Sequence, residues 1–235
     1  MRRLMLVICG AGGSVLSLCL LLLSAGVVSS EPMPAQPDAD SMQVHLPYQI
    51  PGTTLVAQKL VCYEGPYLED NSNDEVVDVA ALILKNEGCD GIEEAWIELS
   101  WDDGSFVFEA YMIPPGETVL VCDAARQFFG FHLWTSCAGY AIYDDQDWTF
   151  AGAITIEETN MSELTVTNRS SEALKDISII YKTYLASSGI YVGGSFYRTQ
   201  VSMLLPGETA IVNPWGYAGG NSKVVYVGGD KADSH

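Results

Sequence analysis

The chain has 235 residues, of which 48% are hydrophobic and 17% are charged, with 30 acidic residues against 11 basic ones. The formal net charge is −19, and it becomes −21 if Arg2 and Arg3 leave with a cleaved leader, so nucleic acids and anionic lipid headgroups are poor partners. The charge is uneven, because residues 55–147 carry 19 acids and three bases, whereas residues 148–229 carry six acids and five bases. We expect the acidic part to meet solvent, cations or a basic partner.

The N-terminal segment, residues 1–30, has the features of an export signal. Arg2 and Arg3 precede an uncharged apolar run at 4–28, and small residues follow this run. Cleavage after Ser30 would release a secreted protein, but 25 apolar residues could also cross a bilayer of about 30 Å as an uncleaved anchor. Either outcome places the rest of the chain outside the cell.

Residues 31–54 contain five prolines and few large apolar side chains, a composition typical of an extended tether. The remaining length suits two domains that each bury a core. We expect an acidic domain at 55–148 that holds four cysteines, a second domain at 149–229 and a short tail at 230–235.

Both domains show the alternation of apolar and polar residues that half-buried strands produce. The expected strands of the first domain are 55–62, 76–85, 95–101, 106–113, 119–122 and 139–143. Those of the second domain are 154–158, 163–167, 178–184, 196–204, 210–212 and 223–227. The predicted fold class is therefore all-β, with two tandem immunoglobulin-like antiparallel β-sandwich domains after an N-terminal signal or anchor segment.

Two motifs occur once in each domain. The pattern L-x-[LV]-x-N ends at Asn86 and at Asn168, and Pro-Gly-Glu-Thr follows at 115–118 and at 206–209. The two copies of Pro-Gly-Glu-Thr are farther apart in sequence than the two copies of the Asn motif, as expected for repeats that diverge by loop insertion. Pro-Gly-Glu-Thr predicts a turn that leads into a strand, and each Asn side chain is expected to bond the backbone of the next loop.

Four cysteines follow the leader, and all belong to the first domain: Cys62, Cys89, Cys122 and Cys137. An even number in an exported domain favours two intradomain disulfides, and the sequence leaves their pairing open. Reduced thiols are the alternative, and a thiolate metal site would lack the usual C-x-x-C pair.

Little in the sequence indicates catalysis or a cofactor. His132 is the one histidine inside a predicted domain, and adjacent carboxylates face opposite sides of a strand, so we predict no catalytic residue, no cofactor and no enzyme. In the oxygen-rich loop 69–75, Asp70 and Asp74 weakly resemble the start of a calcium loop, but Glu75 takes the place of the required glycine. A solvated turn is the favoured interpretation.

An aromatic loop follows the Pro-Gly-Glu-Thr strand of each domain. Phe129 and Trp134 belong to the first loop, and Trp215 and Tyr217 to the second. Exposed rings could stack on sugars or fill a partner's pocket, whereas buried rings would close the end of each sandwich or the seam between the domains.

Several segments resemble an uncharacterised group of exported proteins from Gram-positive gut bacteria. They are 80–86 and 113–117 in the first domain and 193–197, 205–209 and 222–227 in the second. More distantly, each copy is similar to bacterial envelope sandwich modules with an Asn in an early strand and L-x-P-G-E late. The resemblance implies a cell-envelope location and a non-enzymatic module, and it identifies no functional residue.

We therefore expect a non-catalytic envelope protein, extracellular or at the cell surface, with a structural or protein-interaction role. The alternative is a pair of carbohydrate-binding modules that use the loops around Trp134 and Trp215. The expected partner is an unknown protein or a glycan at the cell surface, and a membrane is involved only through the N-terminal segment if this stays uncleaved.

Overall fold

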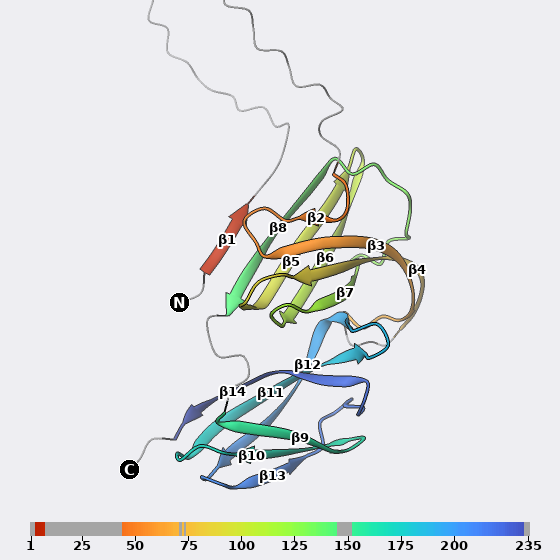
Figure 1. Cartoon of the computed structure of the whole chain (residues 1–235). Coiled ribbons are helices and arrows are strands. Elements are labelled where there is room, and N and C mark those ends of the chain that lie inside the picture. The colour runs from red at the N-terminus through yellow and green to blue at the C-terminus, as the bar shows by residue number, and fades with distance from the viewer. Residues whose placement is uncertain (1–2, 8–43, 71, 73, 145–151, 233–235) are drawn as a thin grey trace, which may run out of the picture.

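The computed structural model describes residues 3–7, 44–70, 72, 74–144 and 152–232, and their regular structure consists of strands in three sheets (Figure 1). None of these residues belongs to a helix long and apolar enough to cross a membrane. The short strand β1 (Arg3–Val7) pairs antiparallel with β8. The rest of the predicted leader, the tether up to residue 43 and the predicted domain boundary at 148 lie outside the described residues.

Two sheets pack face to face in the first half of the chain, which gives it the character of a β-sandwich. One contains β2 (Tyr48–Gln49), β3 (Leu55–Pro66), β4 (Glu75–Asn86) and β7 (Thr118–Cys122). The other contains β5 (Gly91–Trp101), β6 (Gly104–Ile113) and β8 (Ser136–Asp144), with β1 at its edge. Large apolar side chains from both sheets are fully buried between them, including Leu82, Leu84, Ile97, Phe106 and Phe108.

The second half repeats this arrangement strand by strand. One sheet contains β9 (Ile154–Asn160), β10 (Glu163–Asn168) and β13 (Thr209–Val212), and the other contains β11 (Leu174–Leu185), β12 (Ile190–Leu204) and β14 (Ser222–Lys231). The orders β13-β10-β9 and β14-β11-β12 match β7-β4-β3 and β8-β5-β6 of the first half. The internal repeat inferred from two short motifs is therefore a repeat of the whole strand order.

All twelve predicted strands are present, and most extend beyond their predicted ends. The predicted tether needs a correction, because residues 44–54 pack on the first core instead of extending away from it. Ile50 is fully buried, and Val44, Leu46 and Tyr48 pack against the core at alternate positions. The segment is rich in proline, but its apolar residues also alternate with other residues over a short stretch that includes β2. The predicted tail also begins too early, because β14 continues to Lys231.

The repeated Asn and Pro-Gly-Glu motifs meet in space in both halves. Asn86 Nδ2 donates to the carbonyls of Asp90 (2.8 Å) and Pro114 (3.2 Å), and Asn168 Nδ2 donates to those of Glu172 (2.8 Å) and Leu204 (3.0 Å). Both Asn side chains are fully buried, and each bonds the next loop to a residue that lies one or two positions before the Pro-Gly pair.

The turns have the predicted conformation. The N–H of Glu117 donates to the Pro114 carbonyl, and the N–H of Glu208 donates to the Leu205 carbonyl. The intervening glycines have φ values of 72° and 76°, which a residue with a Cβ atom rarely adopts. The two predictions about the motifs are therefore confirmed.

The sequence did not predict that the two halves share a sheet. At the start of β12, Tyr191 and Val192 pair in parallel with Val119 and Leu120 of β7, so seven strands run in the order β14-β11-β12-β7-β4-β3-β2. Side chains from β11, β12 and β14 extend the first core across the junction: Ile180, Tyr191 and Val225. The two halves are thus joined by backbone pairing and by apolar packing.

Candidate functional site

The first aromatic loop, residues 128–134, is held at both ends by backbone hydrogen bonds. Before it, the Gln127 carbonyl accepts from the N–H of Ala80 (3.0 Å), and the N–H of Phe129 donates to the Asp78 carbonyl (2.7 Å), so the loop starts along β4. At its end, the Trp134 carbonyl accepts from the N–H of Val44 (2.9 Å). The loop therefore crosses the open end of the first sandwich between two fixed points.

The side chains of this loop divide into an inner and an outer set. The His132 ring stacks on Trp101 with 3.9 Å between centroids, and Trp134 packs against Phe106 at 5.8 Å. The outer set is apolar and exposed to solvent: Phe128 (76%), Phe129 (41%), Phe131 (92%) and Leu133 (61%). Residues 131–134 alternate between the two sets, as expected for an extended segment with one buried side.

A pocket of about 380 Å³ opens beside this loop. It is lined by residues 129–134, by 44–46 and by 58–60 of β3. The volume lies within the range of small-ligand pockets, and the lining is mostly apolar and aromatic with a few polar groups. We call this pocket and the exposed side chains of the loop the aromatic end.

The second aromatic loop is arranged differently. Trp215 is 70% exposed and leans on Tyr197, with 5.7 Å between ring centroids. Tyr217 is buried in the second core, and its hydroxyl donates to Glu158 at 3.2 Å. Of the four predicted contact residues, Phe129 and Trp215 are therefore exposed, Trp134 is half-buried and Tyr217 is buried.

A buried lysine occupies the junction between the halves. Lys182 of β11 is fully buried, and its Nζ donates to the carbonyls of Tyr111 (2.8 Å), Gly194 (3.2 Å) and Ser195 (2.8 Å). Tyr111 belongs to β6 of the first half, so this side chain bonds the edge of one sheet to a bulge in the other. Burial lowers the pKa of Lys182 to about 7, and the nearby Glu69 carboxylate opposes this shift.

Glu69 makes the reciprocal connection from the first half. Its carboxylate accepts hydrogen bonds from the backbone amides of Cys122 on β7 and Gly194 on β12. Burial raises the pKa of Glu69, while the two amides and Lys182 act in the opposite direction. A side chain at Gly194 would meet the Glu109 carbonyl, because its ideal Cβ lies 2.0 Å from that oxygen, so the close approach of β12 and β6 requires glycine here.

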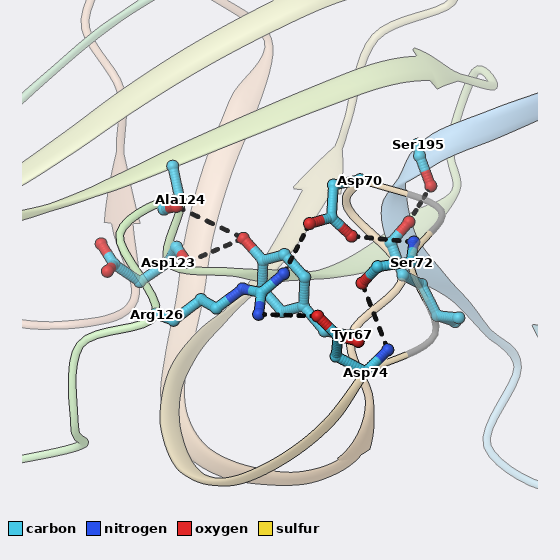
Figure 2. Close-up of polar contacts among 9 residues, drawn as sticks. Tyr67, Asp70, Ser72, Asp74, Asp123, Ala124, Arg126 and Ser195 are labelled. Carbon is cyan, nitrogen blue, oxygen red and sulfur yellow. Dashed lines mark hydrogen bonds and ion pairs between the residues drawn. The ribbon is translucent and has the colours of Figure 1, made fainter.

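The loop that carries Glu69 is held by Arg126 (Figure 2). The guanidinium pairs with Asp70 at 2.5 Å and with Asp74 at 3.2 Å, and it lies 4.1 Å from the Tyr67 ring centroid. The hydroxyl of Tyr67 in turn donates to the Asp123 carbonyl at 3.2 Å. The two carboxylates considered as weak calcium ligands thus face an arginine, and no group of metal-binding side chains is found among the described residues.

The predicted disulfides are not formed between the four cysteines, all of which lie in the described part of the chain. Register separates two of them. Cys62 lies opposite Ala80 and Cys122 opposite Ala81, so these two thiols belong to opposite faces of one sheet, while Cys137 packs in the core from the other sheet. Cys62 and Cys89 are exposed, and burial raises the pKa of the Cys122 thiol to about 12.

The roles of the junction residues Lys182, Glu69 and Arg126 were not predicted from the sequence. One signal was present, because Ile177, Ile179, Ile180 and Tyr181 form an almost continuous apolar run, which is typical of a strand buried on both faces. A lysine directly after such a run would have been expected to need a buried partner.

No protein-family model, curated protein or solved structure matches the chain.

Proposed function

We propose that the protein is an exported, non-catalytic interaction protein of a bacterial cell surface, and that the aromatic end is its contact surface. In this proposal two tandem immunoglobulin-like sandwiches follow a signal peptide or membrane anchor. The second sandwich and the shared sheet hold the aromatic end in a fixed position relative to the rest of the molecule.

One observation carries the proposal: four large apolar side chains of a single short loop face solvent together. They are Phe128, Phe129, Phe131 and Leu133. Contiguous exposed apolar surface is uncommon on soluble proteins and usually marks a binding site, and aromatic residues contribute most strongly to protein interfaces. The loop is also anchored at both ends, so less conformational freedom would be lost on binding.

Charge favours a protein partner with a basic rim. Residues 44–144 contain 17 acids and three bases, so the half of the chain that carries the aromatic end is strongly acidic. Complementary charge would steer a basic partner to this surface and would disfavour acidic competitors.

The polar groups at the junction support a structural role for that region. Glu69 accepts two backbone amides, Lys182 donates to three carbonyls, and Arg126 is paired with two carboxylates. Such satisfied groups stabilise a fold, whereas a catalytic acid or base must exchange a proton with its substrate.

Carbohydrate binding is the second candidate function, and the exposure of Trp215 favours it. An indole ring at the surface can stack on a sugar, but Tyr217 is buried and Trp134 is half-buried, so no second ring of the predicted set extends this platform. A glycan array probed with the wild type and with Trp215→Ala decides the matter, because sugar binding through this ring must be lost in the variant.

Site-specific photo-crosslinking tests the main proposal. A photoreactive phenylalanine analogue replaces Phe131 in the full chain, in the cells that naturally produce it, and the matched control carries the analogue at Met203. Met203 is 50% exposed and lies on β12 of the second half. We expect a discrete cross-linked protein from position 131 and none from position 203.

The double change Phe129→Ser with Leu133→Ser, in the chain that carries the analogue at 131, should remove this product, because the apolar contact is lost while the reactive group remains. Products that are equal at both positions, or that survive the double change, would contradict the proposed contact surface.

A further inference from the structure

The lining of the pocket at the aromatic end differs in charge from the domain around it. Of the described residues that line it, none is Asp or Glu, although acids outnumber bases 17 to three between residues 44 and 144. The lining does include Lys59, His45 and His132, which can all donate hydrogen bonds. The pocket is thus suited to an anionic group in the middle of an acidic surface.

Lys59 has no carboxylate partner among the described residues. The other two bases of the first half are paired, Lys85 with Glu87 at 3.5 Å and Arg126 with Asp70 and Asp74. Lys59 of β3 is exposed and lines the pocket, while the neighbouring Leu60 packs on the core. An anion could therefore bind Lys59 without first displacing a carboxylate of the protein.

The size of the apolar surface distinguishes a polypeptide from a small free acid. The pocket, at about 380 Å³, has room for one large side chain, but Phe131 and Leu133 of its lining are still 92% and 61% exposed, and the exposed Phe128 lies outside the lining. A small acid would leave this rim exposed to water, whereas a polypeptide that continues out of the pocket would cover it.

We propose that the pocket binds the C-terminal residue of a partner polypeptide, with an apolar side chain inside the pocket and the α-carboxylate against Lys59. The inference rests on the proposed function, because it names the part of the protein partner that the aromatic end recognises. The outer side chains of the loop then contact the residues that precede the C-terminus.

Fluorescence anisotropy with a matched pair of peptides tests this. The probe is a labelled hexapeptide, Gly-Ser-Gly-Ser-Gly-Phe, with a free C-terminal carboxylate, and its partner has the same sequence with a C-terminal amide. We expect the amide to bind about tenfold more weakly, because it lacks the charge-assisted contact with Lys59.

Lys59→Met should lower the affinity for the free acid to that for the amide, while Lys59→Arg should largely preserve it. Lys85→Met is the matched control, since it removes a cation of the same domain outside the pocket, and it should leave both affinities unchanged. Lys59 is exposed, so we expect its variants to fold normally. Unaltered circular dichroism spectra of the variants would exclude a folding effect.

Equal binding of acid and amide, an unchanged affinity in Lys59→Met, or no binding of either peptide would overturn the inference. N-acetylphenylalanine that binds as tightly as the hexapeptide would also overturn it, because the pocket would then select a small acid. The proposed function is judged separately: a protein cross-linked at position 131 through an internal segment would support that function and refute C-terminal recognition.

Discussion

At the scale of single residues, two buried asparagines explain why the chain repeats its motifs. Asn86 and Asn168 each end a strand, and each side chain bonds both the following loop and a residue one or two positions before the Pro-Gly pair. Their oxygens also accept the backbone N–H of Gly88 and of Ser170. An asparagine at this position thus makes hydrogen bonds to three backbone groups from a fully buried side chain.

Replacing Asn168 by Ala should therefore cost about 2 kcal/mol of the free energy of unfolding, because two carbonyls and one amide each lose a hydrogen bond to this fully buried side chain. Urea denaturation measures this difference. Asn160→Ala is the control: Asn160 is exposed and bonds only the nearby Ser162, so the change should stay within about 0.5 kcal/mol. Equal effects of the two substitutions would contradict this role of Asn168.

The role of the asparagines could be predicted from the sequence because it is local: the side chain bonds a loop that follows within a few residues. The role of Lys182 could not, because its partners Tyr111, Gly194 and Ser195 come from other strands and depend on how these strands pair. The disulfide prediction was wrong for the same reason, since the number of cysteines says nothing about the faces on which Cys62 and Cys122 lie.

At the scale of elements, the junction depends on an irregularity in β12. The pairing of β11 with β12 shifts between Tyr181 and Thr183, where residues 193–196 of β12 face Lys182 alone. At this irregularity the Gly194 and Ser195 carbonyls accept hydrogen bonds from Lys182, and the Gly194 amide donates to Glu69. The two glycines at 193 and 194 make this close passage possible, because Cβ atoms at both positions would clash with the first half.

The pKa of Lys182 makes this junction sensitive to pH. Its pKa is about 7 in the folded protein and 10.5 for an ordinary lysine, so between these values the unfolded chain binds a proton that the folded chain lacks. The free energy of unfolding must then rise with pH between about 7 and 10.5, and the contribution of Lys182 to this free energy is smallest below pH 7. Even the neutral amine keeps two N–H groups for its carbonyl partners.

Lys182→Met removes the titrating group and retains most of the side-chain volume. The unfolding free energy of the wild type, measured relative to this variant by urea denaturation, should increase by a few kcal/mol between about pH 7 and pH 10. Lys223→Met serves as the control, since that lysine is exposed, and the wild type should show no comparable increase relative to it. A difference between wild type and Lys182→Met that stays constant with pH would show that Lys182 remains charged.

The strands could be predicted almost completely, because alternation and turn residues are properties of adjacent residues. The pairing of β7 with β12 could not, since it joins only two pairs of residues across about seventy positions of chain. The pocket could not be predicted either, because its lining comes from three segments that are separate in the sequence: 44–46, 58–60 and 129–134. Of these segments, only the aromatic loop was identified from the sequence as a possible contact surface.

At the scale of the whole molecule, two copies of one strand arrangement form one body with different surfaces. The first copy carries the negative charge, the aromatic end and all four cysteines, and the second copy carries almost balanced charge. The first core continues across the junction through Ile180, Tyr191 and Val225, and Lys182 and Glu69 bond one half to the other. The shared sheet, the continuous core and these hydrogen bonds thus join the two copies into one body.

Differential scanning calorimetry of the purified protein tests this claim most directly. If the shared sheet and the junction make the two halves one cooperative unit, a single transition is expected, with a ratio of calorimetric to van't Hoff enthalpy of about 1. Two resolved transitions, or a single peak with a ratio of about 2, would show that the halves unfold independently and would contradict the account.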